Sequence, residues 1–196
     1  MKDPVQKLLI ASAMLAGTMG VAHAAAPTFY AGADVARLTT KIDDQTGTPA
    51  NFSGTADTVT LRLRGGAHFV PGLDAELHAV LPQSGTYSNT SRPNSLKTTV
   101  ASVFAKPNVD AGPVNIYGLI GYSYAFVDLS GVVKSQQSAS GFAYGAGIGY
   151  AFTRNVSGSL DYVQYAREKN ISVPGFAGGI DVNTRAVGVS FTYWFR

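Results

Sequence analysis

The final ten residues of the chain restrict its fold more than any other segment. Large apolar side chains stand at every second position: Val187, Val189, Phe191, Tyr193 and Phe195. The positions between them carry Gly188, Ser190, Thr192 and Trp194, which are mostly small or polar. Successive side chains of a strand point to opposite faces, so the pattern predicts a strand with one apolar and one mostly polar face. The apolar face needs either a protein core or the interior of a bilayer.

The other end of the chain predicts export from the cytoplasm. Lys2 and Lys7 flank a short basic region, residues 8–22 are apolar, and Ala22-His23-Ala24 forms an A-x-A cleavage site. These features are typical of a secretory signal peptide. The alternative, a transmembrane helix, needs a run of about 20 apolar residues. We therefore expect a signal peptide at residues 1–24, with Ala25 as the alternative cleavage point, and one domain at residues 25–196.

Composition excludes several classes of protein. Charged residues make up 14% of the chain, whereas a soluble domain usually has about 25%. A surface that faces lipid needs fewer charges, so the low value favours a membrane protein. The net charge of +3 is too small to indicate a nucleic-acid partner. Cysteine is absent, which excludes disulfides and thiolate metal sites, and we expect neither a metal nor a cofactor.

A period of two recurs along the chain, and helical periodicity does not. The pattern predicts eight strands, at residues 28–39, 57–69, 73–81, 96–106, 114–128, 141–153, 156–167 and 187–196. The fourth strand alternates poorly, and its faces stay unassigned. Long polar connections (41–56, 82–95, 129–140 and 168–180) alternate with short turns (70–72, 107–113 and 154–155).

This alternation predicts an all-β fold, an eight-stranded antiparallel transmembrane up-and-down β-barrel. Outer-membrane barrels have short periplasmic turns and longer extracellular loops, which places both termini of this chain in the periplasm. The alternative is a soluble barrel such as a lipocalin, with an apolar interior and a polar exterior. The charged residues of the second and third predicted strands lie opposite the apolar face, which favours the membrane barrel.

The chain also resembles a known family. Phe191, Tyr193 and Phe195 look like the C-terminal insertion signal of outer-membrane barrels, although the trailing Arg196 departs from that signal. With the signal peptide and the eight strands, the chain resembles outer membrane protein X, Ail, the neisserial opacity proteins and the OmpA transmembrane domain. The resemblance implies an outer-membrane location and a monomer that contacts lipopolysaccharide. It also implies insertion by the barrel-assembly machinery and a structural or adhesive role on the cell surface.

The polar face of the strands predicts a charged network inside the barrel. Its members are Asp34, Arg62, Arg64, His68, Asp74, Glu76, His78, Asp161 and Arg167. If Phe69 pairs with Leu73 across the first turn, His68 faces Asp74 and Arg64 faces His78, with Glu76 diagonal to Arg64 and His68. Such a set could act in catalysis or ion conduction. We favour a packed core of mutually neutralising charges, because an eight-stranded barrel has little free lumen.

Three functions remain open. A surface-exposed structural or adhesive barrel is favoured, a narrow channel for small solutes is the alternative, and a lipid A-modifying enzyme is the third. The lipid A deacylases carry a His-x-Ser pair, whereas this chain has His68-Phe69-Val70 and His78-Ala79-Val80, so we expect no enzyme. The glycines at 145, 147 and 149 lie inside a predicted strand, which excludes a nucleotide-binding loop.

Two surface features carry binding hypotheses. Arg37 and Arg185 continue the outward face beyond the apolar stretch of the first and last strands. Because a guanidinium binds phosphate through two hydrogen bonds, we predict that they contact lipopolysaccharide phosphate. The long connections are the predicted recognition surface, with residues 86–90 and 173–176 as binding tips that present an aromatic side chain.

Overall fold

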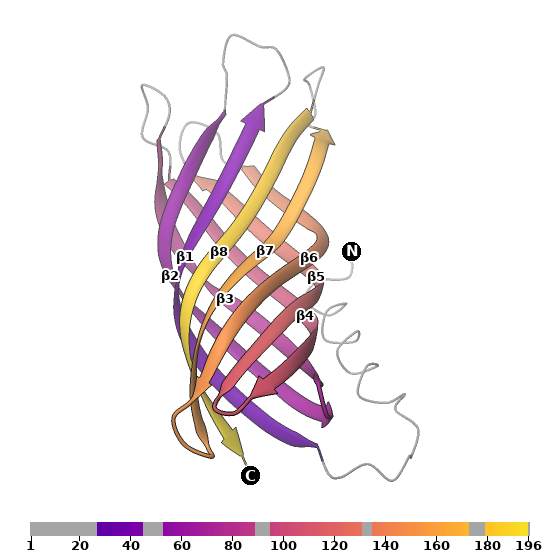
Figure 1. Ribbon diagram of the computed structural model, residues 1–196. Helices are drawn as coiled ribbons and strands as arrows, with labels where there is room; N and C mark the ends of the chain where they lie inside the picture. Colours follow the sequence, from indigo (N-terminus) through magenta and orange to yellow (C-terminus); the bar gives the residue numbers. More distant parts are fainter. Residues whose placement is uncertain (1–26, 45–52, 89–94, 131–134, 173–178, 196) are drawn as a thin grey trace.

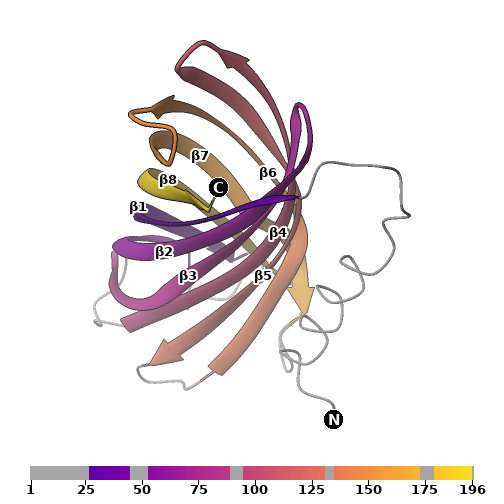
Figure 2. The same ribbon diagram turned by 90° about the horizontal axis from the view of Figure 1, so that it is seen from below.

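The computed structural model describes residues 27–44, 53–88, 95–130, 135–172 and 179–195. The predicted signal peptide, residues 1–24, lies outside them. The described part forms eight strands in a closed barrel (Figures 1 and 2). They are β1 (Thr28–Asp44), β2 (Gly54–Val70), β3 (Leu73–Ser88), β4 (Ser95–Ala111), β5 (Val114–Ser130), β6 (Ser135–Ala151), β7 (Val156–Ser172) and β8 (Gly179–Phe195).

Each strand pairs antiparallel with the next, and β1 pairs with β8 to close the barrel. This is the predicted all-β, up-and-down topology. The start of β1 and the end of β8 lie at the same end as the three tight turns (Figure 1). No helix within the described residues is long and apolar enough to span a membrane.

Two of the tight turns depend on glycine. Gly72 has a φ of 83° and Gly112 a φ of 65°, a region that residues with a Cβ rarely adopt. The first turn differs from its prediction, because Val70 pairs with Leu73 and a bulge lies at Phe69. The second is also shorter than predicted, since β4 continues as strand to Ala111.

The strands run to 16 or 17 residues, beyond the predicted bounds at the end opposite the tight turns. β1 continues to Asp44, and β8 begins at Gly179 instead of residue 187. Backbone pairing in a closed barrel needs no apolar side chains, so the ladder extends past the lipid-facing stretch. In those extensions the outer face is mostly polar and the inner face carries apolar residues such as Ile42, Val182 and Ala186, so the lipid-facing alternation that reveals a strand in the sequence disappears.

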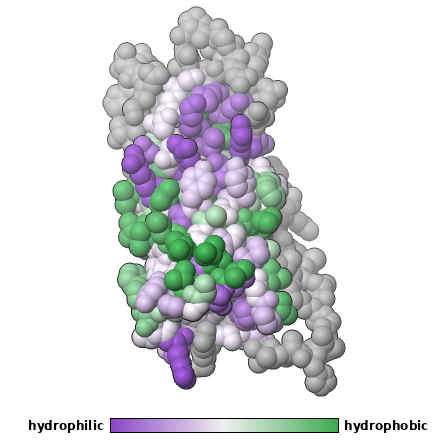
Figure 3. All heavy atoms as spheres, in the orientation of Figure 1, coloured by the Kyte–Doolittle hydropathy of each residue, from purple (hydrophilic) through white to green (hydrophobic). Residues whose placement is uncertain are grey.

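The outer face carries the large apolar side chains, as predicted. Examples are Val35, Leu63, Ile148, Val189 and Phe191, all exposed on the barrel surface. The face shown in Figure 3 carries a hydrophobic band with a mainly hydrophilic zone above it. An apolar surface of this extent requires a bilayer around it.

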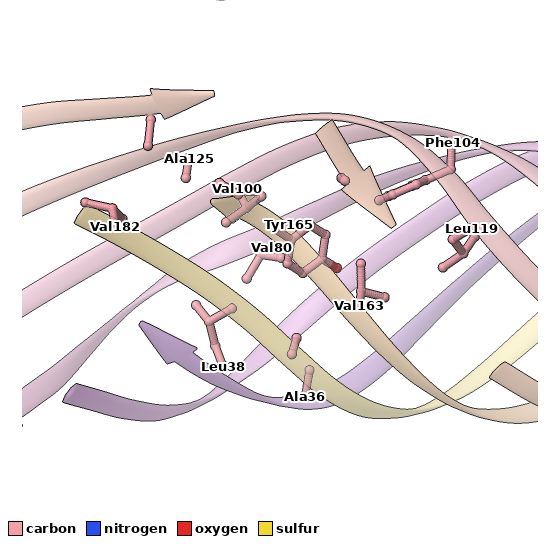
Figure 4. Close-up of a cluster of buried hydrophobic side chains, with 14 of the residues drawn as sticks. Ala36, Leu38, Val80, Val100, Phe104, Leu119, Ala125, Val163, Tyr165 and Val182 are labelled. Carbon is pink, nitrogen blue, oxygen red and sulfur yellow. The ribbon is translucent and has the colours of Figure 1, made fainter. Parts of the chain in front are cut away.

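The interior differs along the barrel axis. Nearer the tight turns it holds charged and aromatic side chains, whereas farther along each strand it becomes apolar, with Leu38, Val80, Val100, Val163 and Val182 turned into the lumen (Figure 4). The alternation in the sequence is too weak to assign the faces of β4. The structure turns Val100 and Phe104 inward and leaves Ala101 and Val103 on the outer side, so its apolar residues lie on both faces and hide the alternation.

Glycines on the inner face make room for the lumen aromatics. A Cβ on Gly66 would collide with the ring of Tyr30, and a Cβ on Gly147 would collide with the ring of Tyr117. The glycine-rich segment of β6 is therefore a packing surface for a large side chain from β5.

Candidate functional site

The candidate site is a cluster of buried charges in the part of the lumen nearer the tight turns. Strands β1, β2, β3, β4 and β7 contribute the charged side chains. Its cations are Arg62, Arg64 and Lys106, and its carboxylates are Asp34, Glu76 and Asp161, all of them buried. These two sets are equal in number, and a fourth buried carboxylate, Asp74, lies beside them and is paired with His68; buried charges need such partners.

Arg62 binds three partners on two other strands. Its Nε lies 2.6 Å from Asp34 Oδ2 and its Nη2 lies 2.6 Å from Asp161 Oδ1. Its Nη1 donates to the Tyr165 hydroxyl at 2.8 Å. The planar guanidinium thus links β1 to β7 across the lumen from β2, and its side chain is completely buried.

Arg64, one inward position closer to the turns, is bound as tightly. Its Nη2 and Nε donate to Glu76 Oε1 at 2.5 and 3.1 Å. Its Nη1 reaches Asp161 Oδ2 at 3.1 Å and the hydroxyls of Ser159 and Ser190 at 3.2 and 2.9 Å. The two arginines therefore share Asp161, which joins their hydrogen bonds into one network.

Glu76 is the most heavily engaged carboxylate of the cluster. Besides Arg64, its Oε1 accepts from His78 Nε2 at 2.6 Å. Its Oε2 accepts from Lys106 Nζ at 2.8 Å and from the Tyr30 hydroxyl at 2.6 Å. Lys106 Nζ also lies 4.4 Å from the centroid of the Tyr117 ring, a distance at which a cation is attracted by the ring face.

His78 joins the Glu76 group to the Arg62 group. Its Nδ1 lies 3.0 Å from the Tyr165 hydroxyl, which also accepts from Arg62. A neutral imidazole with its hydrogen on Nε2 satisfies every contact, since Tyr165 then donates to Nδ1. Ser159 and Ser190 bond to Arg64 and to each other. Neither serine is bonded to His78, so this geometry does not supply a serine nucleophile with its base.

The cluster opens toward the tight turns into a cavity of about 220 Å³. His68 and Asp74 stand in its wall, 2.6 Å apart between Nδ1 and Oδ1. Lys106, Tyr117 and Trp194 also line it. The predicted facing of His68 with Asp74, and of Arg64 with His78, is present in the strand register.

Eight of the nine residues predicted for the lumen network face the interior; Arg167 does not. A bulge in β7 between Gln164 and Ala166 shifts the register by one residue, which reverses the faces beyond it. Tyr165 is buried in the lumen, and Arg167 is exposed on the outer side. The prediction that Arg167 lies in the lumen is therefore wrong.

Sequence reasoning also missed members of the cluster. Lys106 was missed because β4 could not be given faces, and Tyr117 because only the outward side of β5 was read. Pairing across the second turn would have found Lys106, since it stands opposite Asp74 in the β3–β4 register. Ser190, which bonds Arg64, was identified only as a small residue on the inner face of the last strand.

Arg37 on β1 and Arg185 on β8 lie on the outer face of the barrel, as predicted, and both are exposed. Arg37 Nη2 lies 2.9 Å from Asp57 Oδ2, and the Thr39 hydroxyl donates to Asp57 Oδ1 at 2.5 Å. Asp57 stands beyond the apolar band. The Thr39 hydroxyl and the Arg37 guanidinium hold the pKa of the Asp57 carboxyl below its usual value of 3.8.

The predicted insertion signal lies on the lipid side. Phe191, Tyr193 and Phe195 are all exposed on the outer face of β8, and the rings of Tyr193 and Phe195 meet edge to face at 5.3 Å. The predicted binding tips, residues 86–90 and 173–176, lie largely outside the described residues, which do not include 89–94 and 173–178.

Comparison with known proteins agrees with the fold. Residues 8–195 match the family model of the outer membrane protein beta-barrel domain. The chain belongs to this family, and its place is the outer membrane. No curated protein matches the chain in sequence.

Solved structures of outer-membrane proteins have the same fold. Neisserial surface protein A is 22% identical, with a TM-score of 0.55 over 85% of this chain and 97% of that one. OprG from Pseudomonas aeruginosa is 15% identical, with a TM-score of 0.62 over 89% and 98%. Ail, the attachment invasion locus protein of Yersinia pestis, is 16% identical, with a TM-score of 0.50 over 86% and 97%.

Proposed function

We propose that this protein is an outer-membrane scaffold with a plugged lumen, which presents four loops at the cell surface in a structural or adhesive role. The observation that carries the proposal is the charge-balanced cluster around Arg62, Arg64 and Glu76. A scaffold of this kind acts through what its loops contact, because segments held on a rigid framework are where proteins usually place recognition.

The contents of the lumen support closure. The inner side chains of the cluster reach one another across the barrel with hydrogen bonds of 2.5 to 3.3 Å. Farther from the tight turns, Leu38, Val80, Val100 and Val163 add an apolar layer (Figure 4). An ion that crossed the barrel would have to break the ion pairs and then lose its water in the apolar layer.

The orientation follows from the connections. The tight turns and both ends of the described chain lie at one end of the barrel, and the longer connections lie at the other (Figure 1). In outer-membrane barrels the short turns are periplasmic. We therefore place both termini in the periplasm and the four longer connections outside the cell. The exposed aromatic row of Phe191, Tyr193 and Phe195 is the segment that we expect the barrel-assembly machinery to bind.

The adhesive role is tested by exchanging the loops. A variant in which residues 45–52, 89–94, 131–134 and 173–178 become Gly-Ser segments of equal length keeps the barrel strands. We expect cells that display it to lose attachment to host cells or matrix proteins that cells with the native chain retain. A heat-dependent gel shift, which marks a folded barrel, serves as the control. Equal attachment by both cell types would contradict the adhesive role.

A narrow channel is the second candidate, and two observations favour it. The cavity of about 220 Å³ already reaches Arg64 from the turn end. In β4, the buried hydroxyls of Thr98 and Ser102 have no hydrogen-bond partner among the described residues, which suits water in the lumen. Current recordings in a planar bilayer decide between the candidates. Steps of constant conductance would establish the channel, and a silent bilayer with a folded barrel would support the plugged scaffold.

A further inference from the structure

Three arginines stand on the outer face of three neighbouring strands: Arg37 on β1, Arg185 on β8 and Arg167 on β7. We call them the arginine belt. In the β1–β8 register Arg185 pairs with Thr39, two residues beyond Arg37. In the β7–β8 register Arg167 pairs with Asn183, two residues beyond Arg185. Each arginine is thus the diagonal neighbour of the next, at a Cα separation of about 8 Å.

This stagger brings the belt to one level in the membrane. The strands lean, so that a rung of the ladder descends from β1 through β8 to β7 when the longer connections point upward (Figure 1). Arg185 lies two residues above the rung that passes through Arg37, and Arg167 lies two residues above the rung that passes through Arg185. For strands tilted by about 40°, two residues raise a side chain by about 5 Å and one rung lowers it by about 3 Å, so the three arginines lie within about 4 Å of one level.

The level is the upper edge of the apolar band. Directly below Arg37 on the outer face of β1 stands Val35, and directly below Arg185 on β8 stands Val187; both are about half exposed or more. On β7 the outward position below Arg167 belongs to Gln164, which pairs with Arg185, and the exposed Tyr162 stands one outward position lower, opposite Val187. The face shown in Figure 3 changes from hydrophobic to hydrophilic over the same height. The guanidiniums therefore stand where acyl chains give way to headgroups.

The β7 bulge completes the belt. Without the extra residue, position 167 would point into the lumen, where the sequence places it. The Gln164 side chain holds the bulge: its Nε2 donates to the carbonyl oxygens of Thr184 and Ala166 at 3.0 and 3.2 Å and to Asn183 Oδ1 at 2.7 Å. A bulge held by a buried side chain is a fixed feature of the fold, and its result is a third outward arginine.

The charges of this surface leave room for an anion. Among the side chains that the structure describes, Asp57 contacts the belt through Arg37, so the described part of this level holds three arginines beside that carboxylate. Above the belt Lys41 is paired with Asp43 at 2.9 Å, and Asp181 stands opposite Asp43 on β8. The excess positive charge is therefore confined to the level of the headgroups.

We propose that the arginine belt binds the phosphate groups of lipopolysaccharide, with Arg167 as its third contact. A guanidinium fork fits a phosphate through two parallel hydrogen bonds, and diagonal neighbours at this spacing can converge on one headgroup. The acyl chains of the same molecule would lie along Val35, Val187 and Tyr162 below. The proposal rests on the outward orientation given above.

The test compares lipopolysaccharide binding by the full barrel and by its variants in phosphatidylcholine vesicles. The triple variant Arg37→Gln, Arg167→Gln, Arg185→Gln removes the belt. The matched control replaces two exposed cations away from the belt, Lys97→Gln on β4 and Arg154→Gln in the turn between β6 and β7. We expect the triple variant to bind at least about tenfold more weakly, since it loses charge-assisted hydrogen bonds to the phosphates, and the control to bind as the native chain does.

Two further arms identify the chemistry. Lipopolysaccharide stripped of phosphate should bind the native chain as weakly as the intact lipid binds the triple variant. Arg167→Gln alone should weaken binding severalfold, and Arg167→Lys should restore only part of it, because an ammonium lacks the fork. Unchanged binding in the triple variant, or in Arg167→Gln, would overturn the proposal.

The orientation is measured separately. A tag inserted at residues 45–52 should bind antibody on intact cells. If it binds only after the outer membrane is opened, the orientation fails while the vesicle result stands. If the tag is accessible and the triple variant binds normally, the belt proposal alone fails.

Discussion

The barrel holds two groups of arginines that differ in almost every respect except the side chain. Inside, Arg62 and Arg64 are fully buried, and each nitrogen that carries a hydrogen bond has a carboxylate or hydroxyl of the protein as its partner. Outside, Arg37, Arg167 and Arg185 are exposed, and among the described residues their one ion pair is that between Arg37 and Asp57.

This difference in burial and bonding indicates a different role for each group of arginines. Burying a guanidinium costs several kcal/mol unless its partners are fixed in place, so the inner pair must be complete within the chain itself. An exposed guanidinium keeps its water and needs no such partner, so evolution is free to leave it for a ligand. Inside, arginine specifies one packing of the strands. Outside, it is available for recognition of the surroundings.

The sharpest way to break this contrast is to remove an arginine from each group. Arg62→Ala leaves Asp34 and Asp161 without their shortest ion pairs, which are 2.6 Å each. The free energy of unfolding should fall by about 3–5 kcal/mol. Urea unfolding from phosphatidylcholine vesicles, followed by the fluorescence of Trp194, the only tryptophan of the chain, measures it.

The matched outer variant is Arg185→Ala. In vesicles without lipopolysaccharide we expect a change within about 0.5 kcal/mol, as for most exposed positions. Similar losses for Arg62→Ala and Arg185→Ala would show that the lumen cluster does not stabilise the barrel as described.

The sequence allowed much of the inner group to be predicted, for a physical reason. On β2 and β3, charged residues alternate with apolar ones, so the pattern predicts that Arg62, Arg64, Glu76 and His78 lie on the inner face. A short turn then fixed which of them stand opposite one another. Periodicity and turn length were sufficient where both were regular.

Prediction failed where regularity ended. The bulge at Tyr165 reverses the faces of β7, and nothing in the residues 164–167 separates a bulge from a straight strand. On β4 the inner face carries Val100 and Phe104, so polarity no longer distinguishes inside from outside, and Lys106 was missed. The apolar layer of the lumen was missed for the same reason, because an interior Leu38 or Val163 looks like a lipid-facing residue.

A smaller effect is expected for Lys106→Met, which sharpens the account of the inner group. The variant keeps the volume of the side chain and removes one cation from Glu76, which retains Arg64, His78 and Tyr30 as donors. We expect a loss of about 2 kcal/mol, the contribution of a hydrogen bond to a charged group. Lys97→Met, on the outer face of the same strand, is the control and should leave urea unfolding unchanged.

Tyr165→Phe tests the hydroxyl that joins the contacts of Arg62 to those of His78 and Glu76 inside the lumen. The hydroxyl bonds Arg62 Nη1 and His78 Nδ1, whereas the ring packs beside Phe104 and His78 and stays in the variant. We expect a loss of about 1 kcal/mol in the free energy of unfolding. Tyr122→Phe, which removes an exposed hydroxyl, is the control. A loss as large as that of Arg62→Ala would mean that the bulge itself depends on this hydroxyl.

The smallest effect on stability is expected from removal of the Asp57 carboxylate. Its removal should favour ligand binding by the outer arginines, whereas removal of an inner carboxylate should destabilise the barrel. The folded chain holds the pKa of Asp57 below 3.8, so its ion pair stabilises the barrel above that pH and the contribution is lost as the pH falls through the lowered pKa. The exposed pair contributes less than about 1 kcal/mol. Asp57→Asn should therefore flatten the pH dependence of urea unfolding below pH 4, and Thr39→Val, which removes the main donor to Asp57, should flatten it in part.

At neutral pH Asp57→Asn also frees Arg37 and raises the net charge of the belt, so lipopolysaccharide should bind more tightly. Loss of a carboxylate from the inner cluster weakens the protein, whereas loss of this one should strengthen its binding. A variant that binds lipopolysaccharide more weakly than the native chain would place Asp57 among the contacts that position the arginines, and the outer group would then be as fully organised by the protein as the inner one.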